Sequence, residues 1–189
     1  MENKKIYAIV GMCGSGKTEV INYLQKKYKW PKVYLGGATF ERMKKENLEL
    51  NYENEKITRE KIRAELGMGA YATLALSKVE KFLETNDVVL IESLYSWSEY
   101  KIFKNKYQDS FEVIAVFASP KTRFERLTLR KNERPMNNIE EFERRDYSEI
   151  ENVEKGGPIA RADYTLNNEG GVKDLHKQIE DIIKTNGKK

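Results

Sequence analysis

A glycine-rich octapeptide close to the start of the chain has the residue types and spacing of a phosphate-binding loop. Residues 11–18 match the pattern GxxxxGK[ST]. Its glycines let backbone N–H groups converge on an anion, its lysine can reach the β- and γ-phosphates of a nucleotide, and its threonine hydroxyl can ligate Mg²⁺. The pattern predicts that the chain binds ATP with Mg²⁺. We expect the nucleotide to contact Gly11, Met12, Cys13, Gly14, Ser15, Gly16, Lys17 and Thr18.

The elements expected on either side of this octapeptide support that interpretation. Ile6–Val10 is a short apolar run typical of a strand, and Glu19–Tyr28 has apolar residues at helical spacing. A loop between a strand and a helix is the structural context that the motif requires. The positive end of the helix adds to the attraction for phosphate. A chance match in a glycine-rich turn is therefore the weaker interpretation.

A carboxylate follows a second apolar strand, Val88–Ile91, in the dipeptide Glu92-Ser93. A strand that is apolar throughout is typical of the centre of a parallel sheet, and ligands bind beyond the carboxyl ends of such strands. We predict that Glu92 either orients the magnesium shell or acts as the general base. Thr18 and Glu92 then form a minimal magnesium site. The alternative is a solvated glutamate at a strand end.

Arginines recur at helical spacing further along the chain. Arg123, Arg126 and Arg130 lie three or four residues apart on one expected helix, so that one face presents three guanidinium groups, and Arg145 lies on the next charged helix. Bidentate, permanently charged guanidinium groups suit the charge on a transferring phosphoryl group. We interpret 130–146 as a lid, with Arg126, Arg130 and Arg145 as catalytic candidates. Ion pairs with neighbouring glutamates are the alternative.

The segment 36–69 is expected to be mainly helical and is the natural place for a phosphoryl acceptor. Its arginines Arg42 and Arg63 are candidates for binding an acceptor phosphate, although charge on a helix surface is an equal alternative. Tyr95, close after Glu92, could stack on a base or could simply pack in the interior.

Length and composition predict one domain over 1–189 and exclude several classes of protein. The chain has 34 basic and 30 acidic residues, and no dense basic stripe, which disfavours nucleic acid as a partner. It has no apolar run of about 18 residues, so we expect no membrane span. A single cysteine, Cys13, permits no intramolecular disulfide, and we predict a cytoplasmic protein.

Strands and helices alternate along the chain, which predicts an α/β fold with a mostly parallel sheet covered on both faces. Between the first two strands and the third we expect a helix over Phe40–Leu48, a polar loop over Asn51–Lys56 and a helix over Thr58–Leu66. The expected strands are Ile6–Val10, Lys32–Leu35, Val88–Ile91, Val113–Phe117 and Tyr164–Leu166.

Several stretches together resemble nucleoside monophosphate kinase-like phosphate-loop proteins, an adenylate-kinase-related group also similar to dephospho-CoA kinases. Besides the phosphate loop they are 113–127, 141–146 and 162–168. The resemblance implies a three-layer fold with a five-stranded parallel sheet in the order 2-3-1-4-5, a helical acceptor region and a short lid. It also implies roles for Arg126 and Arg130 in the helix leading into the lid, and for Asn168 near the adenine of ATP.

The resemblance also implies transfer of the ATP γ-phosphoryl group to a nucleotide-type small molecule. We expect a monomer or a homodimer. A dephospho-CoA kinase-like enzyme is one alternative that the resemblance implies. A non-catalytic ATP-binding sensor is another, because Glu92-Ser93 stands where Asp-Gly is usual. A regulatory GTPase is excluded, since 105–108 fails the guanine motif and no Asp-x-x-Gly sequence occurs. An oligomeric motor ATPase would need a further helical domain.

Overall fold

The computed structural model describes residues 4–130 and 136–186. Five parallel strands form one sheet in the order β2-β3-β1-β4-β5, which confirms the predicted 2-3-1-4-5 arrangement. Because all strands run the same way, their carboxyl ends meet at one edge of the sheet. The strands are β1 (Lys5–Val10), β2 (Lys32–Tyr34), β3 (Val88–Glu92), β4 (Phe111–Phe117) and β5 (Tyr164–Asn167).

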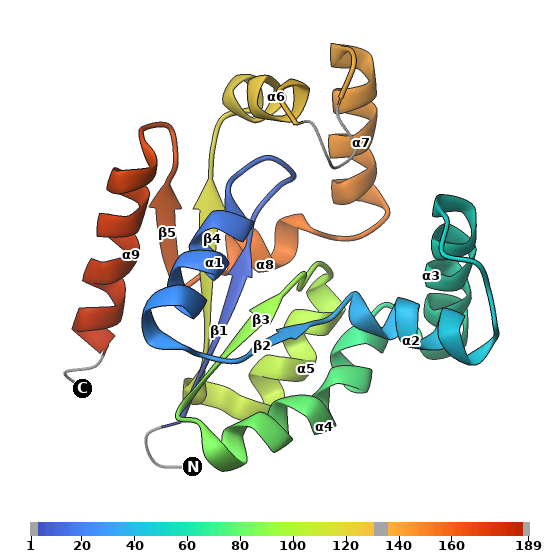
Figure 1. Ribbon diagram of the computed structural model, residues 1–189, viewed down its shortest axis with the longest axis horizontal. Helices are drawn as coiled ribbons and strands as arrows, with labels where there is room; N and C mark the ends of the chain where they lie inside the picture. The colour runs from blue at the N-terminus through green and yellow to red at the C-terminus, as the bar shows by residue number, and fades with distance from the viewer. Residues whose placement is uncertain (1–3, 131–135, 187–189) are drawn as a thin grey trace.

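Helices cover both faces of this sheet and give the three-layer α/β fold expected from the sequence (Figure 1). Helices α1 and α9 pack on one face, and α4 and α5 pack on the other. The helices are α1 (Lys17–Tyr28), α2 (Gly37–Lys45), α3 (Tyr52–Leu66), α4 (Ala70–Thr85), α5 (Trp97–Tyr107), the 3₁₀ turn η1 (Gln108–Ser110), α6 (Pro120–Thr128), α7 (Ile139–Glu151), α8 (Gly156–Ala160) and α9 (Val172–Asn186).

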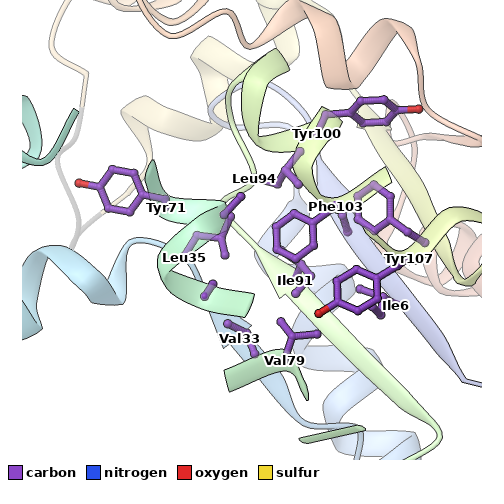
Figure 2. Packing of buried hydrophobic residues seen from close by; sticks show 14 of the residues in the cluster. Ile6, Val33, Leu35, Tyr71, Val79, Ile91, Leu94, Tyr100, Phe103 and Tyr107 are labelled. Atoms are coloured by element: carbon purple, nitrogen blue, oxygen red, sulfur yellow. The ribbon is translucent and has the colours of Figure 1, made fainter. Parts of the chain in front are cut away.

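Alternate residues of the central strand β1 supply both halves of the core. Ile6 packs with Val79 of α4 and Phe103 of α5 in the larger cluster (Figure 2). Its neighbour Tyr7 and also Ile9 pack on the other face, against α1 and α9. A strand buried on both sides must be apolar throughout, which is why its sequence shows a run rather than an alternation.

The region after β2 differs from the expectation. The stretch 51–56 was expected to be a loop, but α3 begins at Tyr52, so this prediction is wrong. The side chain of Asn51 caps the helix by accepting a hydrogen bond from the Asn54 N–H at 2.9 Å. Such a cap stabilises a first turn that is polar and shows no apolar periodicity.

Two pairs of helices project beyond the sheet at the edge where its strands end. Figure 1 shows α6 and α7 past the end of β4, on the side of the β1–α1 loop, and α2 with α3 to the side of β2. Helix α7 contains the last part of the predicted lid, 139–146, and α2 and α3 lie in the predicted acceptor segment 36–69. Within the ranges 4–130 and 136–186, no helix is long and apolar enough to cross a membrane.

Candidate functional site

The loop between β1 and α1 has the backbone geometry that its glycines allow. The φ angles of Gly11, Gly14 and Gly16 are 143°, 82° and 105°. Residues with a Cβ rarely adopt such positive values. A Cβ at Gly16 would also lie 2.2 Å from Nδ2 of Asn168. The loop therefore curls tightly against the end of β5, as the sequence motif predicts.

Lys17 lies at the end of this loop, at the first position of α1. Its ammonium donates a hydrogen bond to the carbonyl of Met12 at 2.9 Å and so closes the curl of the loop. The pKa of Lys17 is lowered to about 7, first by burial and next by the positive charge of Lys155. A cation placed beside a second cation is stabilised by any anion that binds between them.

The side of the loop nearest β5 contains a short hydrogen-bonded chain. Asn168 donates from Nδ2 to the carbonyl of Ser15 at 2.7 Å, and Arg126 donates from Nη2 to the carbonyl of Asn168 at 2.8 Å. In the described ranges, the buried Oγ of Ser15 and Nη1 of Arg126 have no hydrogen-bond partner. Buried polar atoms normally have partners, so these two atoms fit a polar ligand at the loop.

Arg123 does not join the other arginines. It is 4% exposed and donates from Nη1 to Oδ1 of Asp146 at 2.8 Å and to the carbonyl of Cys13 at 3.2 Å. The expectation that one face of one helix presents three guanidinium groups is therefore wrong: Arg123 is buried, and α6 ends at Thr128, before Arg130. Helical spacing alone could not show that α7 packs against this position.

Helix α7 and the turn before α8 bring charged groups to the opposite side of the loop. Glu149 accepts from Nε of Arg145 at 3.3 Å and from Nζ of Lys155 at 2.6 Å. The ammonium of Lys155 lies 4.5 Å from the ring centroid of Tyr95. Lys155, Glu149 and Arg130 all influence the pKa of Lys17, so these three charged groups lie near the loop.

Glu92 lies at the end of β3, where its strand neighbour is Ile9 of β1. Its carboxylate is half-buried and forms an ion pair with Nζ of Lys32 at 2.6 Å. In the described ranges, no group of three or more His, Cys, Asp or Glu side chains could hold a metal by itself. A magnesium site at Thr18 and Glu92 would need the oxygens of phosphate and water, as magnesium bound with nucleotides usually has.

The two arginines of the predicted acceptor segment have different surroundings. Arg42 forms ion pairs with Glu46 and, at 3.1 Å, with Glu65, so protein carboxylates already neutralise it. Arg63 lies over the ring of Tyr71, 5.6 Å from its centroid, and its buried Nε has no partner in the described ranges. Of the two, Arg63 has the geometry of an arginine open to a ligand.

Comparisons with known proteins agree with this geometry. The AAA domain family matches residues 8–152. A UPF0200 protein of Pyrococcus furiosus is 38% identical over 179 residues, which cover 94% of this chain and 95% of that protein. One of Methanococcus maripaludis is 37% identical over 180 residues, 95% of this chain and 96% of that protein. The chain belongs to both the AAA domain family and the UPF0200 family.

Solved structures similar to this UPF0200 chain include small-molecule kinases. A shikimate kinase from Acinetobacter baumannii, in complex with shikimate, aligns with a TM-score of 0.62, 20% identity and coverage of 98% of this chain and 96% of that one. A gluconokinase from Sinorhizobium meliloti aligns with a TM-score of 0.56, 12% identity and coverage of 98% and 97%. The resemblance to phosphate-loop kinases is therefore confirmed at the level of the fold.

Sequence reasoning missed two residues of the loop's surroundings, Glu149 and Lys155. Both belong to a strongly charged stretch in which no motif distinguishes them. The nearest signal was the doublet Gly156-Gly157, which predicts a break after the charged helix. In the structure these glycines begin α8, and the left-handed residue of the preceding turn is Glu154, with a φ of 56°.

Proposed function

We propose that this UPF0200 protein is a phosphotransferase that moves the γ-phosphoryl group of Mg-ATP to a nucleotide-type small molecule. The observation that carries the proposal is the curled loop Gly11–Thr18, with Lys17 at its end and the cations Lys155 and Arg130 near it. We place the whole activity in one domain, 1–189, with 36–69 as the acceptor region and 130–146 as the lid. Residues 131–135 of that lid lie outside the described residues.

On the donor side, the residues of the chain divide into two groups. Asn168 and Arg126 lie by β5 and would hold the nucleoside end, whereas Lys17, Arg130 and Arg145 would bind the phosphates. Mg-ATP supplies the phosphoryl group and the charge neutralisation on its phosphate oxygens. The protein contributes positioning and fixed positive charge, which account for most of the catalysis in this class of reaction.

On the acceptor side, Arg63 supports an acceptor that is anionic. Its half-buried guanidinium, with no hydrogen-bond partner for Nε in the described ranges, suits a phosphate or carboxylate. A nucleoside monophosphate carries such a group, and dephospho-CoA is the second acceptor of this kind.

An ATP-binding sensor is the second candidate function. The observation that favours it is the ion pair between Glu92 and Lys32, because an oxygen of the carboxylate that already contacts an ammonium is not free to ligate magnesium. In a kinase, this ion pair would have to open, or Glu92 would have to act through the carboxylate oxygen that does not contact Lys32.

A phosphoryl-transfer screen separates the two functions. Mg-ATP is incubated with nucleoside monophosphates, deoxynucleotides, nucleosides, dephospho-CoA, shikimate or gluconate, and ADP release is measured. We expect ADP above background with one nucleotide-type acceptor, and none from Lys17→Ala. ATP binding without ADP release under every condition would leave the sensor, and full turnover by Lys17→Ala would refute the whole scheme.

A further inference from the structure

Lys155 is a buried lysine whose role the proposed scheme leaves open. It lies between α7 and α8, is 3% exposed, and donates from its backbone N–H to the carbonyl of Glu149 at 3.2 Å. Its ammonium donates to the carboxylate of the same glutamate at 2.6 Å. Lysines are almost never fully buried unless they are paired. The question is therefore whether the partners of Lys155 fully compensate its charge.

The ammonium of Lys155 has more donors than its partners use. It carries three N–H donors, whereas its partners within the described residues are the Glu149 carboxylate and the ring face of Tyr95. The carboxylate is itself shared, because Arg145 donates to its other oxygen. One carboxylate thus serves two cations, and an excess of positive charge remains in a largely buried place. A second anion would remove that excess.

This excess charge lies next to the phosphate-binding loop. The pKa of Lys17 is lowered first by burial and next by the charge of Lys155, while the charge of Glu149 raises it. Arg130 lowers it further. The loop lysine therefore lies near two more cations, Lys155 and Arg130, and near one carboxylate, that of Glu149. A multiply charged anion is the ligand that such an arrangement favours.

The strand order places Lys155 at one end of this anion site. Asn168, which the proposed function assigns to the nucleoside, follows β5, whereas the Tyr95 ring beneath Lys155 follows β3. Strands β5 and β3 lie on opposite sides of β1 in the sheet. The ammonium is therefore on the far side of the loop from the nucleoside, where the terminal phosphate of a bound triphosphate would lie.

We propose that Lys155 is a second phosphate-binding lysine, which exchanges its carboxylate partner Glu149 for the terminal phosphate of the bound nucleoside triphosphate. This inference rests on the proposed function, since it assumes a triphosphate in the loop with its nucleoside toward β5. In the free protein, Glu149 stands in for that phosphate and holds Arg145 and Lys155 in place.

Isothermal titration calorimetry of the full chain with Mg²⁺ tests the assignment, with adenylyl imidodiphosphate as the triphosphate probe and ADP as the diphosphate probe. Lys155→Met should weaken binding of the triphosphate probe about tenfold or more, the effect of losing a hydrogen bond to a charged group, and should change ADP binding less than about threefold. Lys155→Arg should keep most of the preference for the triphosphate. Glu149→Gln should strengthen triphosphate binding, because the competing carboxylate is gone.

The matched control is Lys106→Met. Lys106 is also paired with a glutamate, Glu80, and lies 5.9 Å from the ring centroid of Tyr107, but it belongs to α5. Lys106→Met should leave the affinities for adenylyl imidodiphosphate and for ADP unchanged. Equal losses for both probes in Lys155→Met, or no loss, would overturn the inference. If Lys155→Met does not fold, Glu149→Gln decides, and an unchanged or weaker triphosphate affinity overturns it.

Failure of the proposed function gives a different result. In that case the wild-type chain would not bind the triphosphate probe, or Lys17→Ala would bind it as tightly as the wild type does. A wild type that binds the probe, with a Lys17→Ala variant that does not, leaves the result at Lys155 as a test of this inference alone.

Discussion

The buried ion pair between Arg123 and Asp146 should contribute strongly to folding stability. The two residues are 4% and 8% exposed, and Arg123 also donates to the carbonyls of Cys13 and Ala118. Arg123→Met leaves a buried carboxylate without its partner, which costs about 3–5 kcal/mol. Since a domain of this size is stable by about 5–15 kcal/mol, we expect a large fall in the free energy of unfolding.

Urea unfolding at pH 7, followed by circular dichroism, measures this cost for Arg123→Met, Asp146→Leu and the double variant. Replacing both partners removes the uncompensated charge, so the double variant should lose much less than the sum of the single variants, with a coupling of about 2 kcal/mol or more. Arg59→Met is the control, because Arg59 makes an ion pair with Glu55 within one helix and is partly exposed. It should cost less than about 1 kcal/mol. Additive costs at Arg123 and Asp146, or a loss no larger than the control's, would refute the reasoning.

Two further predictions concern the phosphate-binding loop and the buried Glu99 near the start of α5. Gly16→Ala should abolish binding of adenylyl imidodiphosphate in calorimetry. Residue 16 has a φ of 105°, which alanine disfavours, and the new Cβ would clash with the Asn168 side chain. Wild-type affinity in this variant would contradict the steric argument. Burial raises the pKa of Glu99 from 4.5 to about 7, against the opposing effects of its backbone hydrogen bonds and of Arg63. A raised pKa means that the folded state loses stability as pH rises from 4.5 to 7, by roughly 3 kcal/mol in total. Urea unfolding at pH 5 and pH 8 should show most of this loss in the wild type and its absence in Glu99→Gln, whereas parallel losses in the two proteins would count against it.

The sheet and the loop could be predicted from the sequence because their signals are local. The apolar runs of β1, β3 and β4 mark buried parallel strands, and the spacing of glycines in 11–18 dictates a curled loop whatever the rest of the chain does. The polar first turn of α3 was missed because its stability comes from a cap at Asn51 rather than from periodicity.

The surroundings of the loop could not be predicted in the same way, because they depend on tertiary contacts. Arg123 and Arg126 are three residues apart on α6, yet the first is bonded to Asp146 and the second to the backbone of Asn168. Overall composition gave no help either, since nearly balanced totals of 34 basic and 30 acidic residues conceal the excess of cations around Lys17.

Helix α7 carries two carboxylates with different roles: one anchors the helix to α6, and the other can give up its cation partners when a phosphate binds. Asp146 and Glu149 are three residues apart, so they lie on the same side of the helix. Asp146 accepts two hydrogen bonds from Arg123, one on each carboxylate oxygen. We therefore expect this pair to stay closed when a ligand binds. Glu149 is shared between Arg145 and Lys155, and a phosphate would stabilise the positive charge of either cation further. Removing Arg123 should therefore reduce stability, whereas removing Lys155 should reduce triphosphate affinity, and the reverse pattern would show that the two pairs have been assigned the wrong way round.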